Sequence, residues 1–361
     1  MRERVDNKRF EAALLRELQW IAGQVEQESL RLESIFFGGG TPSLMEPETV
    51  RALIQEAFTL WPVSDELEIT LEANPTSVEA EKFHQFKEAG VNRLSLGIQS
   101  LKPEILAFLG RQHTPEQSHH ALQLASDLFP RFSFDLIYAL PDQTPKDWEA
   151  ELRQALDRYA PTHLSLYQLT YEPGTPFYRR FQRGDLYEPQ EEIAVELFNI
   201  TQSCTKAHGL QGYEVSNYAV PGQESRHNLG YWRWDPYVGI GPGAHGRLRQ
   251  KGTIHSTQTL KNPEKWLTQV EKTGSGIADM VILTPEQRFL EVFSMGLRLH
   301  EGLNLNRVLK ETGRSLTDWV EIQKLNTLQT EGFIQVTPEK LYLTPQGCLR
   351  LNAVLAYCLG E

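Results

Sequence analysis

Cysteine is scarce in this 361-residue sequence, and its three thiols are widely separated: Cys204, Cys348 and Cys358. No two of them have the CxxC or CxxxCxxC spacing that is typical of metal and iron–sulfur sites. So few thiols at such distances also argue against a disulfide framework. We therefore expect all three cysteines to be buried as small apolar residues.

Long apolar runs and an excess of positive charge are also lacking. No apolar run reaches the roughly 18 residues that a membrane-spanning helix needs. The formal net charge is −11, which argues against broad binding to nucleic acids or anionic membranes. The first ten residues, MRERVDNKRF, contain no apolar core, so they do not resemble a signal peptide. We expect a cytoplasmic protein without a nucleic-acid partner.

The first half of the sequence alternates between β-rich apolar runs and amphipathic segments. We expect strands at residues 34–37, 67–73, 92–98, 132–140 and 163–169. The segment 46–58 has its apolar residues on one helical face. A helix over 77–90 is expected to have Ser77 as its N-cap and Gly90 after its end. Strands separated by such helices predict parallel β/α units, which close into a barrel or open into a doubly wound sheet.

The two ends of the chain depart from this alternation. A helix over 8–25 is expected before any strand, which leaves the strand at 34–37 unpaired on one side. A long helix is expected over 189–209, and residues 284–361 are typical of three helices, a hairpin and a closing helix. The predicted domains are 1–183, 184–283 and 284–361.

The last of these domains has the proportions of a winged helix, a kind of module that in some proteins binds DNA. It carries eight Lys/Arg and nine Asp/Glu, a net charge of −1. DNA-binding modules usually have a basic face. We expect a structural or partner-docking role instead.

Three consecutive glycines follow the first expected strand, in SIFFGGGTPS. In a parallel β/α fold, ligands bind beyond the carboxyl ends of the strands. Gly38, Gly39 and Gly40 would lie at that edge, where residues without a Cβ let a ligand approach the backbone. A tight loop needed only for packing explains these glycines equally well.

Polar residues at neighbouring strand ends favour the ligand interpretation. Glu72 and Gln99 end two of the expected strands, and Asp135 lies within another. A Glu carboxylate can hold an ammonium group, whereas Asp or Gln can bind ribose hydroxyls. Arg111 can pair with a carboxylate through its guanidinium fork. Together they predict a site for an amino acid joined to a nucleoside.

A second candidate site is the segment 224–246, which gathers histidines, tyrosines and tryptophans among five glycines. Imidazole is a good axial ligand for heme iron, and aromatic faces suit a flat macrocycle. His227 is the first candidate ligand and His245 the second. From the residues alone, the favoured alternative is that the aromatic side chains fill the mouth of a barrel.

Eight motifs, in order, resemble the radical S-adenosylmethionine (SAM) family of oxygen-independent coproporphyrinogen oxidase-like proteins. They are FFGGGTPS, LEANP, GVNRLSLGIQS, LGRQH, FDLIYALPDQT, LYQLTYEPGTPF, RHNLGYW and GIGPGAHG. The HNxxYW element is similar to that of the heme chaperone (HemW-type) branch. The resemblance runs from about residue 8 to the C-terminus. It implies an α/β fold: a partial (β/α)6 barrel, here without its first strand, and a C-terminal winged-helix-like module.

The resemblance also implies cofactors and the residues that hold them: SAM, a 4Fe-4S cluster and heme. The SAM positions would be Gly39, Gly40, Thr41, Glu72, Gln99, Arg111 and Asp135, with the first three at the methionine end. The heme positions would be His227 as the iron ligand and, more weakly, Tyr231 and Trp232.

One part of the family pattern is missing. The first strand and its CxxxCxxC loop should precede the first helix, and this sequence contains neither. Three thiolates are needed to hold three irons of the cluster. Either about 25 or more residues precede this start in the full protein, or the chain is a member that lost its cluster. The retained SAM positions favour the first explanation, and we expect no reductive SAM cleavage by these 361 residues.

The function expected from the resemblance is that of a heme chaperone, which binds heme and transfers it to an acceptor hemoprotein. A membrane-bound acceptor would be met by peripheral contact. One alternative is an oxygen-independent coproporphyrinogen III oxidase, a radical SAM enzyme that needs the cluster. Another is a binding module that acts on a protein or on DNA through the C-terminal wing.

Overall fold

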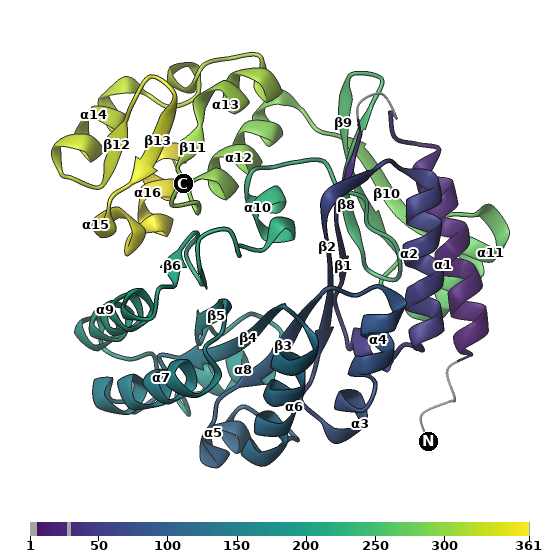
Figure 1. The fold of residues 1–361 in the computed structure, drawn as a ribbon. Helices are drawn as coiled ribbons and strands as arrows, with labels where there is room; N and C mark the ends of the chain where they lie inside the picture. The colour runs from purple at the N-terminus through teal and green to yellow at the C-terminus, as the bar shows by residue number, and fades with distance from the viewer. Residues whose placement is uncertain (1–5, 27–29, 361) are drawn as a thin grey trace. The chain divides into compact units, whose positions relative to one another are not determined.

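The computed structural model describes residues 6–26 and 30–360, which form two compact units (Figure 1). The central unit contains residues 36–44 and 69–225. The terminal unit contains the residues up to 35, residues 45–68 and those from 226 onward. The chain therefore enters the central unit twice. The three domain ranges predicted from the sequence stay a prediction.

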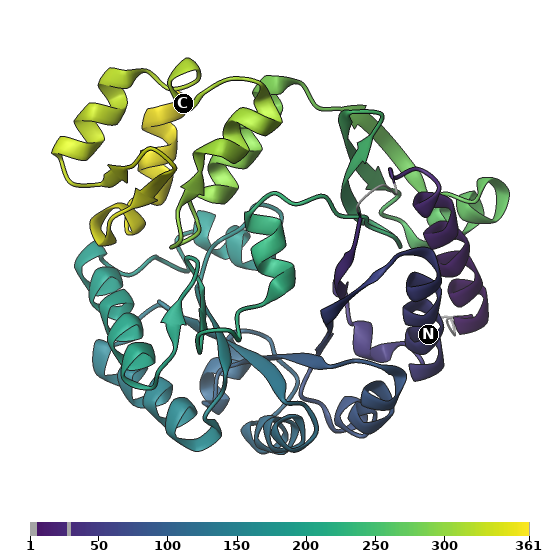
Figure 2. The same cartoon turned by 45° about the horizontal axis from the view of Figure 1, so that its top comes forward.

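The largest sheet has seven strands and mixed direction. They are β1 (Leu32–Phe37), β2 (Val63–Ala73), β3 (Arg93–Gln99), β4 (Arg131–Tyr138), β5 (His163–Gln168), β6 (Gln211–Gly212) and β7 (Asn217–Ala219). Their order is β1-β2-β3-β4-β5-β7-β6. Strands β2 to β5 run parallel, whereas β7 is antiparallel to both β5 and β6. The fold is thus a mixed α/β fold whose parallel strands curl into a partial barrel, as predicted (Figure 2).

Helices alternate with these strands along the central unit. They are α3 (Ser77–Ala80), α4 (Phe83–Ala89), α5 (Pro103–Phe108), α6 (Pro115–Leu128), α7 (Pro145–Tyr159), α8 (Pro176–Gln182) and α9 (Glu191–Ala207). Helix α6 contacts β3 and β4, and α7 contacts α9. In the middle strands apolar and polar residues alternate: Leu94, Leu96 and Phe134, which share one face, are fully buried, whereas Ser95 and Asp135 on the other face are only partly buried.

The helix expected over 77–90 is wrong in two details. It is split into α3 and α4, because the Lys82 N–H bonds the carbonyl of Glu79, three residues back, which tightens the turn. Its N-cap is Thr76, and Ser77 is the first helical residue. Gly90 ends α4 with φ of 112°, as predicted.

The terminal unit begins with two helices, α1 (Asn7–Ala22) and α2 (Pro47–Leu60), which contact each other. A short helix, α10 (Arg226–Trp232), is followed by a three-stranded antiparallel sheet of β8 (His245–Gln250), β9 (Thr253–Thr259) and β10 (Ile277–Ile282). Helix α11 (Pro263–Thr273) packs on α1 through a cluster that contains Ala13 and Trp266. The sequence predicted neither α10 nor this sheet.

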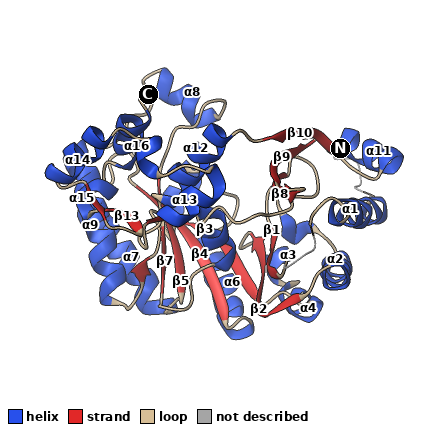
Figure 3. Ribbon diagram, turned by 90° about the horizontal axis from the view of Figure 1, so that it is seen from above, coloured by secondary structure: helices blue, strands red, loops and turns tan. Residues whose placement is uncertain are grey.

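The C-terminal part of this unit, residues 284–360, is called the C-terminal module below. Its helices are α12 (Pro285–Gly296), α13 (Leu305–Thr312), α14 (Ile322–Thr330), α15 (Pro345–Cys348) and α16 (Leu351–Leu359). Strands β12 (Ile334–Val336) and β13 (Lys340–Leu343) form the predicted hairpin, to which β11 (Leu303–Asn304) adds a third strand. Figure 3 shows helices α12 to α16 and strand β13 from above.

Among the residues that the structure describes, no helix combines the length and the apolar character that crossing a membrane requires.

Candidate functional site

A cavity of about 150 Å³ lies in the central unit, at the carboxyl ends of its parallel strands. Six of the seven residues predicted to contact SAM line it: Gly40, Thr41, Glu72, Gln99, Arg111 and Asp135. The seventh, Gly39, does not line the cavity, but its N–H donates to Glu72 Oε2 at 3.2 Å. The structure therefore gathers, around one hollow, residues that are up to 95 positions apart in the sequence.

The three glycines after β1 are needed for two different reasons. A Cβ on Gly38 would lie 2.4 Å from the ring of Phe36, so this position allows no side chain. Gly39 and Gly40 have open space around them but adopt φ of 78° and 65°, a conformation that side chains disfavour. Packing thus explains Gly38, whereas the turn of the backbone toward the cavity explains the other two.

Two carboxylates and one guanidinium group face the cavity. Burial raises the pKa of Glu72, and the N–H of Gly39 acts against that rise. Burial also raises the pKa of Asp135 to about 7, while a hydrogen bond from Ser165 lowers it and the charge of Glu72 raises it further. Arg111 is exposed at the rim. This arrangement offers anionic partners for an ammonium group and a cationic partner for a carboxylate.

Gln99 has an unusual backbone conformation at the edge of this cavity. Its φ is 70°, which is uncommon for a residue with a side chain. The next two residues are fixed by a carboxylate on α7, because Glu151 Oε1 accepts the hydroxyl of Ser100 and, at 2.8 Å, the N–H of Leu101. Glu151 is 2% exposed and thus a buried anchor for the loop that carries Gln99. The sequence analysis missed it.

Glu79 is a second anchor that the sequence analysis missed. Its carboxylate accepts the N–H of Asn74 at 2.8 Å and the hydroxyl of Thr76 at 3.1 Å. It also accepts the hydroxyl of Ser43, which follows the glycine loop. Glu79 therefore joins the loop after β1 to the loop after β2. The pattern T-x-x-E at 76–79, typical of a helix start, was a signal that could have found it.

The predicted heme residues lie on the short helix α10 in the terminal unit. His227 is half-buried, and its N–H donates to Glu68 Oε1 at 3.2 Å. Its ring lies 5.1 Å from that of Tyr231, one helical turn later. Trp232 instead lies under the guanidinium of Arg298, 4.4 Å from its ring centre. Of the predicted heme residues, Tyr231 is thus the one shown in ring contact with His227.

His245, the second candidate heme ligand, opens strand β8. Its side chain is exposed. Its carbonyl would lie 2.0 Å from a Cβ on Gly239, so the glycine at 239 is required by the close approach of two chain segments.

The cysteines do not fit a cluster. Cys204 and Cys358 are buried, Cys348 is half-buried, and all three are free thiols. Burial raises the pKa of each thiol, and that of Cys358 reaches about 11, which disfavours the thiolate that binds iron. Within residues 6–26 and 30–360, no group of three His, Cys, Asp or Glu side chains could hold a metal ion.

Two family descriptions match this chain. Residues 8–155 match the Radical SAM superfamily, and residues 283–350 match the HemN C-terminal domain. "Heme chaperone HemW" of Bacillus subtilis (strain 168) is 37% identical over 332 residues, which cover 91% of this chain and 86% of that protein. "Radical S-adenosyl methionine domain-containing protein 1, mitochondrial" of Bos taurus is 38% identical over 340 residues, which cover 92% of this chain and 76% of that protein.

Other similarities differ in what they cover. The Danio rerio protein of the same name is 40% identical over 282 residues, but the match spans only 62% of its length. A solved structure, described as "Coproporphyrinogen III oxidase (HemN) from Escherichia coli is a Radical SAM enzyme", is similar over 100% of this chain and 85% of that chain. Its TM-score is 0.79 at 19% identity, which shows a shared fold.

Proposed function

We propose that this chain, which belongs to the HemW-type family of radical SAM proteins, binds heme through His227 and transfers it to an acceptor hemoprotein. The similar proteins of Bacillus subtilis and Escherichia coli are named heme chaperones. The observation that carries the proposal is the pairing of His227 with the ring of Tyr231 on one side of α10. An imidazole can ligate the iron while an aromatic ring beside it contacts the macrocycle.

The environment of His227 supports a role as a ligand. Its backbone N–H is engaged by Glu68, which fixes the main chain while the side chain stays half-buried. The ring of Tyr231 also lies 4.3 Å from that of Tyr237, which is a second ring contact. Trp232 is engaged by Arg298 and is proposed as a weaker contact.

The test is a titration of the full chain with hemin, followed by absorption spectroscopy. We expect His227→Ala to weaken hemin binding and to reshape or remove the Soret band, because an axial ligand sets the electronic state of the iron. His245→Ala is the matched comparison and should leave the spectrum unchanged. An unaltered spectrum and affinity in His227→Ala, with a loss in His245→Ala, would assign the iron to His245.

The proposal includes SAM in the cavity of the central unit. Gly39, Gly40 and Thr41 are proposed to receive the methionine end of SAM. Glu72 is proposed for its ammonium group and Arg111 for its carboxylate. Gln99 and Asp135 are proposed for the ribose hydroxyls. Bound SAM would supply a sulfonium centre in this cavity. The 4Fe-4S cluster that the family implies would supply an electron, but the three cysteines of this chain do not fit it. In the proposed chaperone, the SAM site licenses or regulates heme transfer.

An oxygen-independent coproporphyrinogen III oxidase is the second candidate function. It is favoured by the match of residues 283–350 to the HemN C-terminal domain. It needs a cluster, which the three cysteines of this chain do not fit. Formation of protoporphyrinogen IX by the cluster-loaded protein under anaerobic conditions would establish it. For the chaperone we propose the cytoplasm, with peripheral contact where the acceptor is membrane-bound.

A further inference from the structure

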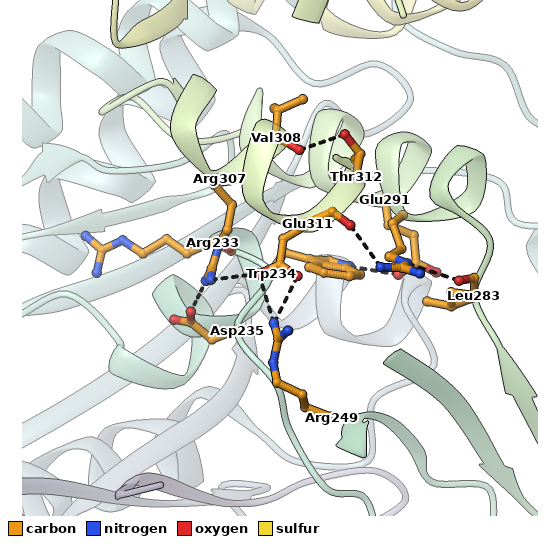
Figure 4. A network of polar contacts seen from close by, with 11 residues as sticks. Arg233, Trp234, Asp235, Arg249, Leu283, Glu291, Arg307, Val308, Glu311 and Thr312 are labelled. Carbon is orange, nitrogen blue, oxygen red and sulfur yellow. Dashed lines mark hydrogen bonds and ion pairs between the residues drawn. The ribbon is translucent and has the colours of Figure 1, made fainter. Parts of the chain in front are cut away.

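Glu291 of helix α12 connects the C-terminal module to the chain that follows α10 (Figure 4). Its Oε2 accepts the indole N–H of Trp234 at 2.8 Å. Arg247 of strand β8 donates to both carboxylate oxygens, each at 2.8 Å. Such a bidentate, charge-assisted pair is stronger and more directional than a neutral hydrogen bond. One carboxylate therefore joins α12, β8 and the segment after α10.

The second connection comes from helix α13. Arg307 donates from Nε to the carbonyl of Arg233 at 3.1 Å and also bonds the carboxylate of Asp235. Arg233 itself forms a bidentate pair with Glu301, at 2.7 and 2.9 Å. These bonds hold residues 233–235 on both sides of Trp234.

The segment between these bonds has a conformation that needs support. Trp234 has φ of 60°, which a bulky residue rarely adopts, and it is 5% exposed. A strained residue persists when its surroundings fix it. The side chains of Arg247 and Glu291 are 16% and 23% exposed, so their pairing is sheltered from solvent. The C-terminal module thus supplies the contacts that keep Trp234 in place.

The same contacts reach His227. Its ring meets Tyr231 at 5.1 Å, and Tyr231 meets Tyr237 at 4.3 Å. Tyr237 and Arg247 exchange both backbone hydrogen bonds, at 3.0 and 2.8 Å. Because the guanidinium of Arg247 pairs with the carboxylate of Glu291, a continuous series of contacts connects His227 with α12. Helix α10 has seven residues, too few for a stable isolated helix, so its position depends on its neighbours.

We propose that Glu291 is a positioning residue for helix α10 and His227, and that the C-terminal module serves to hold this helix. The heme part of this inference rests on the proposed function. The positioning of α10 does not, because it concerns contacts within the chain itself. It gives the module a role that needs neither DNA nor a protein partner.

Hydrogen–deuterium exchange of the full chain, without heme, tests the positioning directly. In Glu291→Gln, the amide oxygen can still accept from Trp234, but the carboxylate that pairs with Arg247 is lost. We expect peptides covering residues 226–235 to exchange about tenfold faster, since the loss of a charge-assisted bond shifts local opening by about that factor. Exchange identical to that of the unaltered chain, in a folded variant, would overturn the inference.

Glu271→Gln is the matched control. Glu271 also forms a bidentate pair with an arginine in the terminal unit, Arg9, at 2.6 and 3.0 Å. That pair joins α1 to α11, so its loss should leave the exchange of residues 226–235 unchanged. Equal acceleration in both variants would mean general loosening of the unit and would also overturn the inference.

A second variant covers the case in which Glu291→Gln does not fold. Trp234→Phe removes the indole N–H together with one ring of the buried side chain, and it keeps both members of the pair between Arg247 and Glu291. It should accelerate hydrogen exchange in the same peptides, by a smaller factor than Glu291→Gln does. If the exchange rates of the peptides covering residues 226–235 and of their neighbours stay the same in this variant, Glu291 does not position the helix through Trp234.

Hemin titration separates this inference from the proposed function. If His227 ligates heme, Glu291→Gln should weaken hemin binding several-fold and shift the Soret band, while Glu271→Gln should not. If the unaltered chain binds no hemin, or if His227→Ala leaves the spectrum unchanged, the proposed function fails. The exchange measurements then still decide whether Glu291 positions α10.

Discussion

Asp135 is the cavity residue whose charge depends most on its surroundings. Burial raises its pKa from 3.8 to about 7, and the nearby charge of Glu72 adds to the rise. An acid with a raised pKa binds a proton more readily in the folded chain than in the unfolded chain. The free energy of unfolding contributed by Asp135 therefore falls as the pH rises from about 4 to about 7, and the full penalty is present above about 7.

Replacement of this carboxyl group should remove the penalty. We expect Asp135→Asn to be more stable than the unaltered chain at pH 8, by about 2 kcal/mol, and by less than half of that at pH 5, where only part of the penalty is present. This is less than the full pKa shift allows, because the carboxylate keeps some exposed surface on the cavity. Urea unfolding at both pH values measures the difference. The same difference at pH 5 and pH 8 would contradict the assigned pKa.

At the scale of the element, the carboxylate of Glu79 connects the loop after β1 with the loop after β2. Glu79 lies in the first turn of α3, yet it bonds Ser43 beyond the glycine loop and Asn74 after β2. A buried carboxylate that loses a donor keeps an unsatisfied oxygen, which costs about 1–3 kcal/mol. The shape of the cavity wall should therefore respond to either end of the bond between Ser43 and Glu79.

A double-mutant cycle tests this connection. Glu79→Gln and Ser43→Ala should each lower the free energy of unfolding, by about 1–3 kcal/mol and about 1 kcal/mol, and the double variant should cost less than their sum. Each should also weaken SAM binding in equilibrium dialysis. Additive effects on unfolding would mean that the two side chains do not interact.

The strands could be predicted because of where they lie. The middle strands bury apolar residues at alternate positions, such as Leu94 and Leu96, and all five expected strands are present as β1 to β5. The strands β8 and β9 were missed because HGRLRQ and TIHSTQT are largely polar. Helix α10 was missed because its seven residues include a glycine and no apolar period. It is held by Glu68, which lies 158 positions before Arg226.

The candidate site, like the fold, could be predicted only in part from the sequence. Glu72, Gln99 and Asp135 could be found because parallel strands bring their ends to one edge. Glu79 and Glu151 could not be found in this way, since their hydrogen bonds go to loops rather than to a ligand. A glutamate in an amphipathic helix is ordinarily solvent-exposed, and sequence gives little sign that it is buried.

At the scale of the whole molecule, the two candidate sites belong to different compact units. The cavity residues all lie in the central unit, whereas His227 and the C-terminal module lie in the terminal unit. The division cuts across the order of the sequence, because residues 36–44 belong with 69–225. The glycine loop therefore belongs to the central unit with the cavity, although residues 45–68, which follow it, belong to the terminal unit.

The iron–sulfur chemistry of the family requires thiolates that this chain does not bring together. Cys204 lies in α9 of the central unit, and Cys348 and Cys358 lie in the C-terminal module. Burial raises the pKa of each, which disfavours the thiolate that binds iron. The 361-residue chain, reconstituted anaerobically with iron and sulfide and then reduced, should give no stoichiometric 4Fe-4S signal in EPR. A variant with all three cysteines changed to serine should take up the same small amount of iron. One cluster per chain, lost in that variant, would show that these thiols do ligate iron.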